Sequence, residues 1–232
     1  SDIFHYLGLV SEYKISDFSF VRAGDTFAYT DDPEIDSGNT TIREDLTHIR
    51  NEVFVQGEFG ILRDRLGLGI VGKNSIKRYQ EDAVADEEDE DVDSVAMELR
   101  YLMGSGFYIV GQGAYAAFDN KSVTVDRGSQ IGTAALGVKK VVNPNVYAQA
   151  SAGYQTVEFD NDNINEDDSV YGALDFVLMK ANSRVKAGVS YGLYGPYVRP
   201  YSAQKRTLLV LAGAHSFDPH LYAGASAQDV QG

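Results

Sequence analysis

The chain of 232 residues contains neither cysteine nor tryptophan. Without cysteine, a disulfide framework and a thiolate metal site are excluded, although the composition is compatible with a chain that crosses an oxidising periplasm. The sequence also lacks an apolar run of the roughly 18 residues that a membrane helix needs. No segment shows sustained helical periodicity, so helices are expected to be minor.

Positive charge is scarce as well, because 20 lysines and arginines stand against 34 acidic residues, a formal net charge of -14. Proteins that bind nucleic acid neutralise phosphates with lysine and arginine, and that class is therefore excluded. Acidic residues concentrate in 81–93 and 161–168. Dense like charge predicts solvated loops there. Carboxylates that bind calcium or lipopolysaccharide-associated cations are an alternative, but neither segment has EF-hand spacing and no metal ligand is named.

What the sequence has in abundance is strict alternation of apolar and polar residues. In the segment 146–159, Val146, Ala148 and Ala150 fall on one face of an extended strand, whereas Tyr147 and Gln149 fall on the other. Similar alternation recurs in pairs of segments along the chain. This pattern predicts an all-β fold made of about twelve antiparallel strands.

The connections between these segments alternate in length. Tight turns rich in Gly, Pro, Asn, Asp and Ser are expected at 14–17, 62–65, 103–106, 142–145, 181–184 and 217–220. Longer loops are expected at 31–44, 81–93, 121–129, 161–169 and 199–204. Outer-membrane β-barrels sort their connections in this way, with short periplasmic turns and longer external loops. The sequence thus predicts a single domain, 1–232, that forms an antiparallel up-and-down transmembrane β-barrel in the bacterial outer membrane.

The expected polarity of the strands also bears on the size of the barrel. With the tight turns in the periplasm, the first strand (3–13) begins outside the cell and the last strand (221–228) ends there. Complete bacterial barrels have an even number of strands and normally keep both termini in the periplasm. The chain is therefore expected to be part of a larger barrel of about 14 to 18 strands.

Many charged residues lie inside the predicted strands, on the face opposite the apolar residues. A lysine or arginine on a lipid face would cost about 2–4 kcal/mol at the bilayer midplane, so this face is predicted to line a hydrated lumen. The lumen-facing candidates are Arg50, Glu52, Gln56, Glu58, Lys73, Glu98, Arg100, Tyr108, Gln112, Lys139, Tyr147, Gln149, Gln155, Tyr171, Asp175, Lys186 and Tyr194.

Tyrosines and glutamines among these candidates favour a path for carbohydrate, because sugars are held by aromatic stacking beside hydrogen-bonding groups. A diffusion porin and a structural surface barrel with a plugged lumen are the alternatives. The mixed sign of the candidate charges predicts no strong ion selectivity. Catalysis is not expected, since the four histidines lie in no recognisable nucleophile context, and no cofactor is required.

The stretch 99–227 resembles the bacterial outer-membrane proteins of the β-barrel porin type 2 family, which are linked to capsule and exopolysaccharide export. The resemblance rests on the sequence of hairpins: 101–106 turning into 107–111, then 148–154 before an acidic loop, then 183–191. It implies export of polysaccharide across the outer membrane, contact with lipid and lipopolysaccharide, and periplasmic and inner-membrane partners. It assigns no individual functional residue.

Overall fold

A computed structural model describes residues 4–30, 47–61, 65–80, 89–120, 128–143, 145–161, 166–180, 183–194, 204–218 and 221–231. Every regular element in these ranges is a β-strand, and none of the described residues forms a helix long and apolar enough to cross a membrane. The strands are β1 (Phe4–Ser16), β2 (Ser19–Thr30), β3 (His48–Ile61), β4 (Leu66–Tyr79), β5 (Glu90–Gly104), β6 (Phe107–Asn120), β7 (Ser129–Asn143), β8 (Val146–Phe159), β9 (Asp167–Lys180), β10 (Ser183–Tyr194), β11 (Gln204–Asp218) and β12 (Leu221–Gln231).

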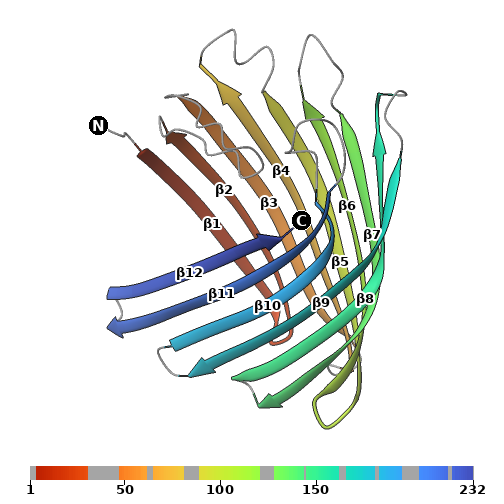
Figure 1. The fold of residues 1–232 in the computed structure, drawn as a ribbon. Coiled ribbons are helices and arrows are strands. Elements are labelled where there is room, and N and C mark those ends of the chain that lie inside the picture. The colour runs from red at the N-terminus through yellow and green to blue at the C-terminus, as the bar shows by residue number, and fades with distance from the viewer. Residues whose placement is uncertain are drawn as a thin grey trace.

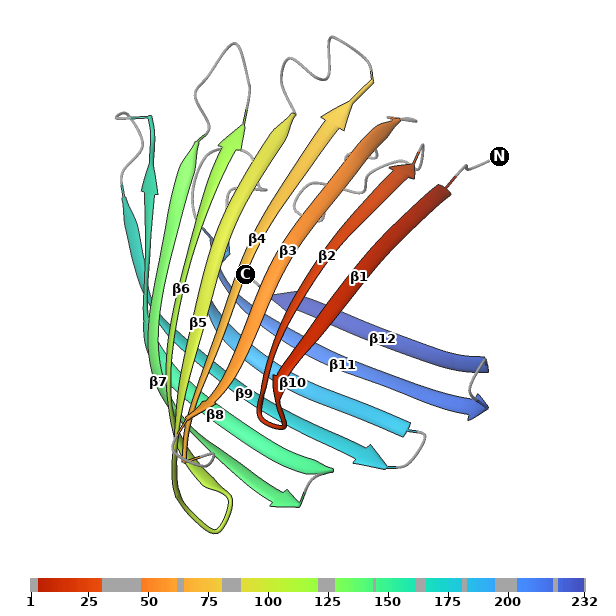
Figure 2. The ribbon, with the colours of Figure 1, turned by 180° about the vertical axis from the view of Figure 1, so that it is seen from behind.

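The strands form one antiparallel up-and-down sheet whose spatial order is the order in the sequence. The predicted all-β, antiparallel architecture is confirmed. The sheet curls so strongly that β10–β12 pass in front of β2–β5 in one view (Figure 1) and behind them in the opposite view (Figure 2). Within the described ranges, hydrogen-bonded pairing runs from β1 to β12 without joining these two edges. The sheet is therefore open, and a closed barrel stays a prediction.

The turn between β5 and β6 illustrates how local sequence sets the strand pairing. Ser105 and Gly106 both have positive φ, 47° and 71°, as a type I′ hairpin turn requires. A Cβ on Gly106 would clash with the carbonyl oxygen of Val141 on β7. Glycine therefore meets two demands at this position, a left-handed backbone and a close approach to the neighbouring strand.

Several strand boundaries differ from those expected. The first turn lies at residues 17–18 instead of 14–17, because β1 continues to Ser16. The acidic segments are also shorter as loops than predicted, since β5 begins at Glu90 and β9 begins at Asp167. The acidic residues at these strand ends are paired with a neighbouring strand, and Asp91 and Asp167 also form ion pairs with Arg78 and Lys205. Composition alone does not reveal these contacts.

The two faces of the sheet differ in crowding. We call the face toward which the sheet curls the inner face; in β5 it carries Ser94, Ala96, Glu98 and Arg100, and the register extends it to the other strands. Apart from glycines and Leu193, all buried residues within the described part of the chain belong to this face. The outer face carries the large exposed apolar side chains, with Val10 and Phe18 as exceptions. The alternation in the sequence thus corresponds to two chemically distinct surfaces.

Candidate functional site: the polar inner face

A network of charged side chains crosses the inner face on β3, β5 and β6. Arg100 Nη2 lies 2.5 Å from Glu58 Oε2, and Arg100 Nε lies 3.6 Å from Glu98 Oε1. The second carboxylate oxygen of Glu98 accepts a hydrogen bond of 3.0 Å from Gln112 Nε2. The side chains of Glu58, Glu98 and Arg100 are only about a quarter exposed (26%, 28% and 27%). Pairing offsets the cost of desolvating these charges.

Glycines on β4 make this network possible. Glu58 and Arg100 are on β3 and β5, so their contact passes over the intervening strand. A Cβ at Gly69 would lie 2.9 Å from Glu58 Oε1, and one at Gly67 would lie 3.3 Å from two guanidinium nitrogens of Arg100. The missing side chains allow the ion pair to lie flat on the sheet.

Similar glycine gaps occur elsewhere on the inner face. A Cβ at Gly188 would lie 2.7 Å from Asp175 Oδ1, and Asp175 pairs with Lys186 at 3.4 Å. Gln155 Oε1 accepts a hydrogen bond of 2.8 Å from the backbone of Leu193, next to a glycine at position 192. Polar side chains therefore lie along the sheet surface at several places.

Three more contacts involve basic side chains of the inner face. Lys73 Nζ lies 2.7 Å from Glu52 Oε2, and Arg50 approaches the same oxygen at 3.9 Å. Lys139 lies over the ring of Tyr147, with 4.5 Å between Nζ and the ring centroid, a cation–π geometry. Each of the mid-strand carboxylates Glu52, Glu58, Glu98 and Asp175 thus has a basic partner.

Two recesses of opposite charge lie side by side on the inner face. The acid-lined recess, of about 330 Å³, has Glu58, Glu98 and Gln112 in its wall and small residues such as Ala114 in its floor; Tyr171 of β9 also contacts it. The cation-lined recess, of about 300 Å³, is nearer the tight turns and is lined by Lys139, Arg100 and Tyr108, together with Phe18, Phe59, Gly60, Gly67 and Val141. Arg100 lines the cation-lined recess, and its guanidinium group pairs with both carboxylates of the acid-lined recess.

The register places all of the lumen-facing candidates on the inner face. The structure brings most of them into the pairs and recesses described above. Gln149 pairs in register with Lys139 on β7 and with Asp175 on β9. Tyr194 ends β10, and its side chain lies outside the described part of the structure.

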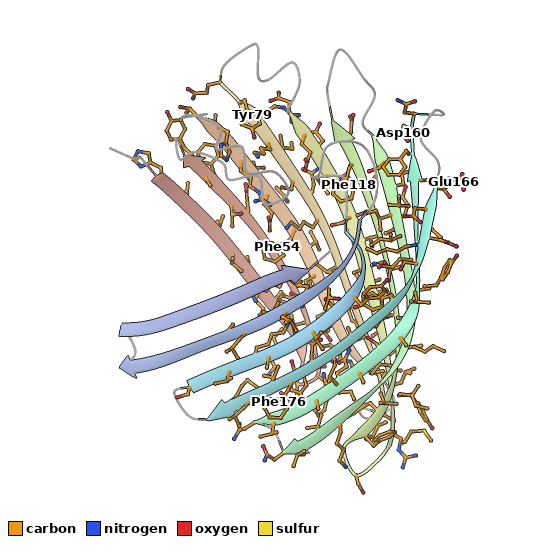
Figure 3. The ribbon with its side chains drawn as sticks, viewed as in Figure 1. Phe54, Tyr79, Phe118, Asp160, Glu166 and Phe176 are labelled. Atoms are coloured by element: carbon orange, nitrogen blue, oxygen red, sulfur yellow. The ribbon has the colours of Figure 1, made fainter. Side chains whose placement is uncertain are left out.

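Sequence reasoning missed Phe54, a large apolar residue that lies between Glu52 and Gln56 on the inner face of β3. Its ring covers Gly24 of β2, where an added Cβ would clash with the ring carbons. Figure 3 labels Phe54 in the middle of the sheet. The alternation would have placed it correctly, because its even position shares the face of its polar neighbours.

The outer face carries an apolar band on the side of the tight turns. In β5 this band consists of Val95, Met97, Leu99, Tyr101 and Met103, all between 46% and 60% exposed. Equivalent bands occupy 53–61, 107–115, 146–154 and 170–178, where every outward position is apolar or glycine. Lys140 of β7 interrupts the band near the turns.

Toward the longer connections the outer face becomes polar. Asn51 Nδ2 donates to Asp25 Oδ1 at 2.7 Å, and Asn74 Nδ2 donates to Asp93 Oδ1 at 2.9 Å. Tyr115 donates to Gln130 at 2.7 Å. Tyr115 lies at the limit of the apolar band, and the other side chains form a row just beyond it. Figure 3 labels Tyr79, Phe118, Asp160 and Glu166 at this same end of the sheet.

Part of the acidic run at 86–91 is held in place by Arg78. Its guanidinium group lies 2.5 Å from Asp91 Oδ1 and 3.6 Å from Asp89 Oδ2, and the backbone of Tyr79 donates to Asp89 at 2.9 Å. The expectation of a fully solvated loop is therefore wrong for Asp89 to Asp91. Residues 81–88 lie outside the described part of the chain.

No protein-family model matches the sequence, and no curated protein matches it. Among solved structures, the chain is similar to BauA, the ferric preacinetobactin receptor from Acinetobacter baumannii, with a TM-score of 0.47 and 12% identity. The match covers 93% of this chain and 45% of the receptor, so the chain spans less than half of the receptor's length. A similarity of this strength carries no argument about function. The resemblance to the β-barrel porin type 2 family stays a prediction.

Proposed function

We propose that the chain forms a wall of a bacterial outer-membrane β-barrel whose inner face lines a path for oligosaccharide or polysaccharide. The observation that carries the proposal is the separation of chemistry between the faces. The outer bands are close to the roughly 9–11 residues that a tilted strand needs to cross a bilayer core. The inner face carries ion pairs and hydrogen-bonding side chains, and water in a lumen would solvate them.

The outer edges of β1 and β12, which pair with no further strand among the described residues, bear directly on this proposal. Backbone amides and carbonyls that lack partners cost several kcal/mol each in lipid, so only closed barrels place strands in membranes. The proposal therefore requires both edges to be paired. Pairing with further strands corresponds to the predicted barrel of about 14–18 strands, whereas pairing of β1 with β12 would give a smaller one.

The choice of saccharide as solute rests on the inner-face side chains. Tyr171 lines the acid-lined recess together with Gln56, Gln112 and Thr133, and small residues such as Ala96 and Ala114 in the same lining leave room for a flat ring. Aromatic contact beside amide and hydroxyl groups is the chemistry that holds sugars. In the saccharide channel that we propose, the paired carboxylates are fixed acceptors for sugar hydroxyl groups.

A plugged structural barrel is the second candidate, and the ion pairs across the inner face favour it. Planar-bilayer conductance of the purified protein, recorded with and without maltooligosaccharides, separates the possibilities. Current that sugars block is expected for the saccharide path. Current indifferent to sugars would instead support a diffusion porin, and a folded protein without current would support the plugged structural barrel.

A further inference from the structure

The charge on the inner face is distributed differently from that of the whole chain. Although the chain carries a formal charge of -14, eight basic residues stand against seven acidic ones on the inner face, counted over the side chains that the structure describes. The basic residues are Lys14, Arg22, Arg50, Lys73, Lys77, Arg100, Lys139 and Lys186; the acidic residues are Glu12, Glu52, Glu58, Glu90, Glu98, Asp167 and Asp175. The excess negative charge therefore lies outside the inner face.

Acidic and basic side chains of the inner face line different recesses. Glu58 and Glu98 both face Arg100 from the acid-lined recess, and Gln112 occupies the second oxygen of Glu98. No carboxylate is among the described residues that line the other recess. Lys139 lies in the wall of that recess against the ring of Tyr147 and forms no ion pair with a described carboxylate, although Glu58 and Glu98 lie within electrostatic range.

We propose that the cation-lined recess is an anion-binding site, in which Lys139 supplies the principal charge and Arg100 supplies further donors. Its ligands are small inorganic anions and acidic substituents of a solute that passes through the barrel. The inference rests on the proposed lumen, because only a hydrated inner face would admit such anions. It assigns a local preference for anions to a protein whose overall charge is strongly negative.

Lys140 provides a matched control for Lys139. The two residues are adjacent on β7 but point to opposite faces, and Lys140 Nζ donates to the carbonyl oxygen of Ser105 in the β5–β6 turn at 2.6 Å. Replacing either lysine with glutamine removes one positive charge from the chain. Only the Lys139 substitution removes it from the recess.

The recess itself can be probed by fluorescence, because the chain contains no tryptophan. In a Tyr108→Trp background, quenching by iodide relative to neutral acrylamide reports the local potential in refolded, detergent-solubilised protein. Residues 108 and 139 are register partners on adjacent strands, and removing one unit charge at such a separation changes the local anion concentration about twofold. Lys139→Gln is therefore expected to halve the iodide-to-acrylamide ratio, whereas Lys140→Gln and Lys139→Arg leave it unchanged.

An equal ratio for the Lys139→Gln and Lys140→Gln variants would overturn the anion site, whether or not the barrel conducts. In planar bilayers under a potassium chloride gradient, Lys139→Gln is also expected to shift the reversal potential toward cations. If Lys139→Gln lowers the iodide-to-acrylamide quenching ratio but the protein carries no current, the anion site is supported and the open channel is rejected. If the protein conducts, but Lys139→Gln changes neither the reversal potential nor the iodide-to-acrylamide quenching ratio, the anion site is rejected and the open channel is retained.

Discussion

At the scale of single residues, the inner face depends on glycine as much as on charge. The Glu58–Arg100 pair crosses β4 because Gly67 and Gly69 have no side chains to obstruct it. Both partners are largely shielded from solvent, and removal of one partner would leave the other charge poorly compensated. Small residues thereby determine which charged groups meet.

Gly69→Val is expected to lower the free energy of unfolding because the valine displaces the Glu58 carboxylate from Arg100. Gly72→Val is the matched control, since it lies on the outer face of the same strand and an added Cβ there meets nothing within 4 Å. Urea unfolding in lipid vesicles should place Gly69→Val below Gly72→Val by about 1–2 kcal/mol. Equal stabilities would show that the glycine gap is not needed for the ion pair.

At the scale of elements, period-two alternation was sufficient to predict which side chains share a face. Shifting a strand by one residue would move every apolar side chain to the opposite face, so the pattern specifies the register strongly. It could not predict contacts that skip a strand, such as Glu58 with Arg100, because these depend on glycines of a neighbouring segment. Nor could it predict the strand character of Asp91, which depends on Arg78 of β4.

The β5–β6 turn supplies a test at this scale. Gly106→Ala is expected to destabilise the sheet by about 2–4 kcal/mol, because a left-handed backbone is combined with a clash against the Val141 carbonyl oxygen. Ser105→Gly should be neutral or stabilising, since glycine adopts positive φ without penalty. Equilibrium unfolding of both variants checks the prediction. A neutral Gly106→Ala would mean that the turn readily adopts another geometry.

For the whole molecule, the sheet curls far enough to give an inner and an outer surface, but its closure depends on the pairing of β1 and β12. Sequence alternation predicted the two surfaces, whereas it contains no information about curvature or about the partner of an edge strand. The described pairing likewise ends at these two strands. The membrane placement is therefore best tested on the central strands, where both faces are well defined.

Single tryptophans on β5 provide that test, because Met97 points outward at 49% exposure and the adjacent Ala96 lines the inner face. In vesicles that contain brominated lipid, Met97→Trp is expected to be strongly quenched, since its ring would contact acyl chains. Ala96→Trp should resist bromine and respond to aqueous acrylamide instead. A third reporter, Asp93→Trp, lies in the polar row beyond the apolar band and should be quenched by bromine near the lipid headgroups but not deep in the acyl chains. If Met97→Trp and Ala96→Trp respond alike to both quenchers, the outer face does not contact lipid. The proposal that this chain forms part of a membrane barrel would then be rejected, whatever the conductance.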